Sequence, residues 1–75
     1  MELDFYLPQR KRGIQACYRL SDDATREREV KALATFHRLY GLNDAVIVTY
    51  SESGTIHLDD LTIRLVPLAS WLLRP

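Results

Sequence analysis

The sequence has little cysteine, glycine or proline and no excess of positive charge, and each of these shortages excludes a common class of protein. Its single cysteine, Cys17, cannot form an internal disulfide or a multi-thiolate zinc site, so nothing requires an oxidising compartment. Ten Lys and Arg balance ten Asp and Glu, so no net positive charge attracts the whole chain to nucleic acid or to an anionic membrane. Only three Gly and three Pro are present, which argues against a disordered tail.

Long apolar runs and phosphate-binding loops are also absent. The longest apolar stretches, 45–48 and 68–73, are far shorter than the roughly 20 residues that span a bilayer, so we expect no membrane association. Residues 1–4 carry acid where a secretory signal carries base and then a long apolar core, so we expect a cytoplasmic location. No glycine-rich loop occurs, so these residues do not bind ATP themselves.

The first twenty residues predict a β-hairpin. Apolar and polar residues alternate over 3–7 and again over 14–20, on either side of the polar segment 8–13. A loop of this length pairs Leu7 with Ile14, and directly opposed residues share a face of the sheet. We expect the apolar face to meet the core and the polar face to be solvated. The apolar set is Leu3, Phe5, Leu7, Ile14, Ala16 and Tyr18, and the polar set is Asp4, Tyr6, Gln15 and Cys17.

The remaining residues predict one long helix, three strands and a short helix. Ser21, Asp22 and Asp23 offer N-cap side chains for a helix over 24–40, which Gly41 is expected to end. The continuous β-branched segment within 44–50 indicates a parallel strand covered on both faces. Two alternating strands meet at Asp59-Asp60, and a short helix follows over 68–73.

These elements predict a small α/β (α+β) fold in one domain, residues 1–75. It contains a mixed sheet of about five strands with a β-hairpin, one long crossover helix and a short C-terminal helix. The predicted core is Phe5, Val30, Leu33, Phe36, Val46, Val48, Ile63 and Trp71.

The hairpin motif resembles a known family. Glu2-Leu3-Asp4-Phe5 followed by Ile14-Gln15-Ala16-Cys17-Tyr18 is similar to the C-terminal domain of a large prokaryotic family of AAA-type ATPases. The similarity extends over nearly the whole chain, through 26–33, 46–49, 54–56, 66–67 and 71–73. The resemblance implies that the chain is the C-terminal piece of a larger ATPase, whose ATP site lies in an upstream domain.

In that family the domain resembles the PD-(D/E)XK nuclease fold, so the resemblance implies a truncated restriction-endonuclease-like core. There an Asp and a following Glu-x-Lys bind Mg²⁺ or Mn²⁺ and activate water. Asp4 stands at the aspartate position and is the one candidate metal ligand, while Gln15 replaces the glutamate and Cys17 the lysine. An amide carries no charge and a thiol does not favour Mg²⁺, so the resemblance implies a degenerate catalytic site.

The cluster of Asp4, Gln15 and Cys17 has a second interpretation, as the ordinary polar face of a solvated sheet. Four basic residues are also open to two interpretations, a solvated turn or a contact with the phosphates of nucleic acid. They are Arg10, Lys11, Arg12 and Arg19.

Three functions remain open from the sequence. The first is a non-catalytic accessory domain that contacts the upstream ATPase domain, another partner or DNA. The second is a metal-dependent DNA nuclease that uses Asp4 together with upstream acids. The third is a dimerisation domain in which the exposed edge of residues 3–7 pairs with a second copy.

Overall fold

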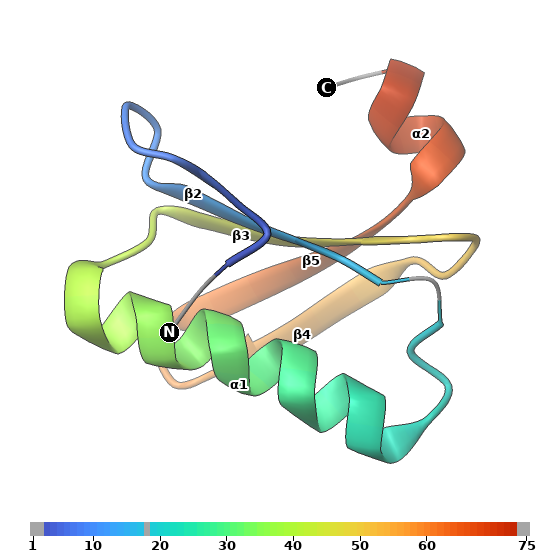
Figure 1. Cartoon of the computed structure of the whole chain (residues 1–75), viewed down its shortest axis with the longest axis horizontal. Helices are drawn as coiled ribbons and strands as arrows, with labels where there is room; N and C mark the ends of the chain where they lie inside the picture. The colour runs from blue at the N-terminus through green and yellow to red at the C-terminus, as the bar shows by residue number, and fades with distance from the viewer. Residues whose placement is uncertain (1–2, 18, 74–75) are drawn as a thin grey trace.

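Five strands and two helices follow one another along the chain (Figure 1). The computed structural model describes residues 3–17 and 19–73, so the expectations for Glu2 and Tyr18 lie outside the described residues. The elements are β1 (Phe5–Leu7), β2 (Arg12–Ala16), α1 (Asp23–Tyr40), β3 (Asp44–Thr49), β4 (Gly54–Leu58), β5 (Leu61–Pro67) and α2 (Leu68–Leu73). This order confirms the small α+β fold that the sequence predicts.

The five strands form one mixed sheet in the order β1-β2-β3-β5-β4. β2, β3 and β5 run parallel to one another, whereas the outer strands β1 and β4 are antiparallel to their neighbours. β3 therefore lies at the centre of the sheet, and its residues 45–49 are all buried. The prediction of a parallel strand covered on both faces is confirmed.

Helix α1 begins and ends at the residues whose chemistry favours these positions. The carboxylate of Asp22 accepts the N–H of Ala24 at 3.1 Å and so caps the first turn. Gly41 has a φ of +80°, and its N–H donates to the carbonyl of His37 at 2.8 Å. Glycine adopts this left-handed conformation without the strain that a Cβ would add.

Helix α1 crosses one face of the sheet and forms the larger part of the core with it (Figure 1). Gly13 of β2 allows the close approach, because a Cβ there would lie 2.8 Å from the Cδ1 of Leu3 and 3.2 Å from the Cδ2 of Leu33. The buried members of this cluster are Leu20, Leu33, Leu42, Ala45, Ile47, Leu61, Ile63 and Leu65.

The opposite face of the sheet, called the open face below, is covered only at one end. The buried apolar cluster there is Ile14, Val46 and Val48, with Val66 and Trp71 packed against it. Trp71 belongs to α2, which lies on the side of the sheet away from α1 (Figure 1). β1 contributes two exposed side chains to this face, Phe5 at 61% and Leu7 at 41% exposure.

Two predictions about the hairpin are wrong. Phe5 pairs with Ile14 and Leu7 with Arg12, so the register differs by two residues from the predicted one. The loop ends at Lys11, which takes a φ of +48°, and Gly13 lies inside β2. β2 therefore spans Arg12–Ala16 instead of the predicted 14–20. Within β1 and β2 this two-residue shift leaves each side chain on its predicted face, because side chains alternate with a period of two. Leu3, predicted to share the face of Phe5 and Leu7, instead packs on the α1 side beside Gly13.

The second error concerns which hairpin face meets the main core. α1 packs on the side of Tyr6, Gln15 and Cys17, which was expected to be solvated. Gln15 is 6% exposed, whereas Phe5, predicted to be in the core, is 61% exposed. The polar side tolerates burial because hydrogen bonds within the protein satisfy the amide of Gln15, as described below.

Candidate functional site

Asp4 closes the N-terminal end of the hairpin through two hydrogen bonds. Its Oδ2 accepts the backbone N–H of Ala16 at 2.8 Å. Its own backbone N–H donates to the Oε1 of Gln15 at 2.7 Å. The structure thus brings Asp4 and Gln15 together, as the sequence predicts, but it uses the carboxylate to hold two strand ends together.

The amide of Gln15 is buried between the hairpin and helix α1. Its Nε2 donates to the Oε1 of Glu29 at 3.2 Å, while its Oε1 accepts from Asp4. The side chain of Glu29 is only 14% exposed, and its Oε2 lies 3.7 Å from the Nε of Arg28. Glu29 is therefore a third member of this polar cluster.

Sequence reasoning missed Glu29, although its position carried a signal. It precedes Leu33 by four residues and Phe36 by seven, so it lies on the helical face that packs against the sheet. An acid on an apolar helical face requires a buried polar partner. Gln15 is that partner.

Cys17 lies beside this cluster as a protonated thiol. Its Sγ donates to the carbonyl of Arg19 at 3.0 Å. Burial raises the pKa of the Cys17 thiol, and the charges of Glu29 and Glu52 raise it further, partly offset by the Arg19 backbone and by Arg28. A thiol with a raised pKa is a poor nucleophile and a poor metal ligand at neutral pH.

The donor set does not fit the Mg²⁺ or Mn²⁺ site that the resemblance implies. The Oδ2 of Asp4 and the Oε1 of Gln15 each accept a backbone N–H, and burial raises the pKa of the Cys17 thiol. Within residues 3–17 and 19–73, no group of three or more His, Cys, Asp or Glu side chains is placed to hold a metal ion. A hard divalent cation prefers several oxygen ligands that are free to approach it.

The four basic residues do not form one patch. Arg10 and Lys11 are exposed in the loop between β1 and β2, whereas Arg19 follows the opposite end of β2. Arg12 is paired through its Nε with the Oδ2 of Asp44 at 2.8 Å. Arg64 approaches the same carboxylate at 2.9 Å, so two cations share one anion on the open face.

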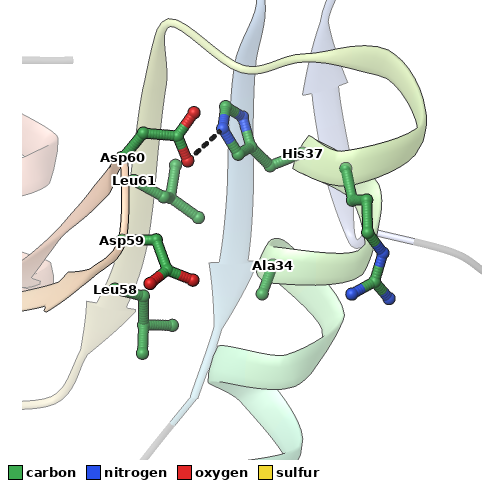
Figure 2. Close-up of a pocket in the computed structure, with 7 residues that line it drawn as sticks. Ala34, His37, Leu58, Asp59, Asp60 and Leu61 are labelled. Carbon is green, nitrogen blue, oxygen red and sulfur yellow. Dashed lines mark hydrogen bonds and ion pairs between the residues drawn. The ribbon is translucent and has the colours of Figure 1, made fainter.

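A separate cavity of about 530 Å³ lies between α1 and the turn that joins β4 to β5 (Figure 2). The Nε2 of His37 lies 3.1 Å from the Oδ1 of Asp60, and its Nδ1 accepts the N–H of Leu42 at 2.9 Å. Both ring nitrogens therefore hold the end of α1 in place, which leaves neither for general-base chemistry. The residues that line this cavity include no Ser, Thr, Cys or Lys.

The open face carries an apolar groove of about 400 Å³. Besides Phe5 and Leu7, the large exposed side chains that line it are Leu68 at 44% and Leu72 at 68%. The complete lining is Phe5, Leu7, Ile14, Ala16, Val48, Leu68, Trp71 and Leu72. Soluble monomers rarely leave a contiguous apolar surface of this kind without a binding function.

No protein-family model, no curated protein and no solved structure matches this chain significantly. The family resemblance therefore depends on the motifs described above. Of the helices in the described part of the chain, none is long and apolar enough to span a membrane.

Proposed function

We propose that this chain is a non-catalytic, degenerate nuclease-like accessory domain of an ATP-binding protein, and that it serves interaction or assembly. The open apolar groove between β1, β2 and α2 is the observation that carries this proposal. Four of its side chains are more than 40% exposed in the isolated chain, although they lie next to one another. A partner that covered them would remove this apolar surface from water, at roughly 25 cal/mol per Å².

The polar cluster supports the non-catalytic part of the proposal. A nuclease of the PD-(D/E)XK type needs carboxylate oxygens that point at a shared metal ion. The carboxylate of Asp4 instead accepts the N–H of Ala16, and the acid of Glu29 accepts from Gln15. These contacts stabilise the hairpin and attach it to α1, which is a structural role.

Contact with DNA has less support than contact with a protein. Asp44 offsets one of the two positive charges of Arg12 and Arg64, and the formal net charge of the chain is zero. Arg10 and Lys11 are exposed in one loop. Two basic side chains can make fewer phosphate contacts than a DNA-binding domain usually makes.

A Mn²⁺ titration monitored by amide signals in NMR tests the proposal against the nuclease alternative. We expect no selective broadening of Asp4, Gln15, Cys17 or Glu29, and no cleavage of a short DNA duplex when Mn²⁺ is present. The matched control is Asp4→Asn, which keeps the side-chain shape and removes the charge. Broadening at these residues that Asp4→Asn abolishes, together with duplex cleavage, would contradict the proposal.

A further inference from the structure

The two edges of the sheet differ in how much apolar side-chain surface they expose. β1 pairs only with β2 among the described strands, and its sequence Phe5-Tyr6-Leu7 contains no charge and no proline. Natural edge strands usually carry such residues, because they discourage pairing with another chain. β4 forms the other edge and likewise contains no charged residue and no proline, but none of its five residues is a large exposed apolar side chain.

Exposed apolar side chains flank the β1 edge on both faces of the sheet. Phe5 and Leu7 are exposed on the open face. On the other face, the ring of Tyr6 lies 4.8 Å from that of Phe36, which lies 4.8 Å from Tyr40. Tyr40 is 64% exposed, so this row of aromatic rings leads from the strand edge to the surface of α1.

We propose that two copies of this chain associate through their β1 edges, antiparallel about a two-fold axis near Tyr6, and join their sheets into one. This inference rests on the proposed function and narrows the assembly partner to a second copy. Two-fold symmetric pairs are the commonest oligomers, and they require a self-complementary surface.

The β1 edge is self-complementary in this arrangement. With Tyr6 opposite Tyr6 of the second copy, Phe5 faces Leu7 of the second copy and Leu7 faces its Phe5. Directly opposed residues share a face, so both apolar pairs lie on the open face. They extend the groove that Leu68 and Leu72 line in each copy. The aromatic rows of the two copies meet on the other face.

Charges at the two ends of β1 also favour the antiparallel orientation. Asp4 precedes the strand, and Arg10 and Lys11 lie in the exposed loop that follows it. A two-fold axis at Tyr6 brings the acidic end of each copy toward the basic loop of the other. Such complementarity selects the orientation and speeds the encounter more than it adds affinity.

The exposed apolar area is suited to a modest interface. A standard interface buries about 800 Å² per partner, and a large aromatic side chain can contribute about 150–250 Å². Phe5 and Tyr40 retain 61% and 64% of their surface, and Leu7, Leu68 and Leu72 add to it. The total is several hundred Å² per copy, which is less than a standard interface buries, so we expect a weak association that depends on concentration.

Sedimentation equilibrium of the whole chain over a range of concentrations tests the proposal. We expect the average mass to rise from 8.7 kDa toward twice that value as the concentration increases. The variant Phe5→Lys with Leu7→Lys should remain a monomer, because four lysines would meet at the joined edge. Both positions are exposed, so the variant should keep the far-UV circular dichroism of the wild type.

The matched control places the same two charges on the other edge. Thr55→Lys with His57→Lys has the same spacing on β4, and both residues are exposed. Its dissociation constant should stay within twofold of the wild type, against at least a tenfold rise for the β1 variant. Leu7→Lys alone is the second variant if the double one fails to fold.

A wild-type chain that stays a monomer at all concentrations overturns the proposal, as does equal weakening by both double variants. Neither result contradicts the proposed function. Selective Mn²⁺ binding together with DNA cleavage would contradict that function instead. If the chain stays a monomer and binds no Mn²⁺, the dimer proposal is overturned and the proposed function stands. The upstream ATPase domain would then be the expected partner of the groove.

Discussion

The two faces of the sheet are built from similar strands but have different outer layers. One face packs against the eighteen residues of α1 and contains eight buried apolar side chains. The other contains three, and the six residues of α2 cover only its end. The difference shows that the apolar side chains of this small domain are divided unequally. The α1 face supplies most of the core, and the open face leaves apolar side chains exposed, which under the proposed function a partner would cover.

The largest expected effect comes from deleting a core side chain on the α1 face. Leu33 is fully buried, so Leu33→Ala should lower the free energy of unfolding by about 2–5 kcal/mol. Leu72→Ala on the open face should cost less than about 1 kcal/mol, because Leu72 is 68% exposed. Urea unfolding measures both, and equal losses would show that the two faces contribute alike to stability.

A smaller effect is expected from placing a third acid in the polar cluster, directly against Glu29. Gln15→Glu sets a new carboxylate against Glu29 at a site where Gln15 is 6% exposed, so we expect a loss of about 1–3 kcal/mol at neutral pH. Repulsion raises the pKa of the pair in the folded state, so the folded protein binds more protons than the unfolded one. The lost stability should therefore return as the pH falls.

The control for this variant is Gln15→Glu combined with Glu29→Gln, which exchanges the two groups across the same contact. It should recover most of the lost stability at neutral pH. If the double variant is as unstable as Gln15→Glu, the contact between Gln15 and Glu29 does not hold the hairpin against α1.

The smallest effect concerns Cys17 at alkaline pH. Its pKa is raised in the folded state by burial, so the unfolded chain ionises first as the pH rises. The stability that comes from the neutral thiol is thus complete below the unfolded pKa and is lost as the pH passes through the folded one. Urea unfolding of Cys17→Ser should show a weaker fall in stability above pH 8 than the wild type, and identical slopes would contradict this.

The local sequence predicts most of the elements correctly for identifiable reasons. The cap at Asp22 and the glycine at position 41 determine where α1 lies, and its observed bounds differ from the predicted ones by one residue. The β-branched run in β3 and the Asp59-Asp60 turn were also interpreted correctly. Each of these signals acts within a few residues, where propensity and capping decide the conformation.

The candidate site could be predicted only in part. Hairpin pairing brought Asp4 near Gln15, as expected. Glu29 was missed because it reaches the cluster across the tertiary contact between α1 and β2. The role of Gly13 was also misjudged, since it was assigned to the loop although it makes room for Leu3 and Leu33. A glycine in a sequence indicates either a turn or a close contact, and only the packing distinguishes them.

The sequence by itself therefore determined the order of the strands and helices, the bounds of α1 to within one residue, and which residues of β1 and β2 share a side. Tertiary structure alone decided which side α1 would cover. The apolar side of the hairpin carries the larger side chains, but the other side accepts α1 because Gly13 admits its leucine and the Gln15–Glu29 contact satisfies the buried polar groups. That choice leaves Phe5 and Leu7 exposed on the open face.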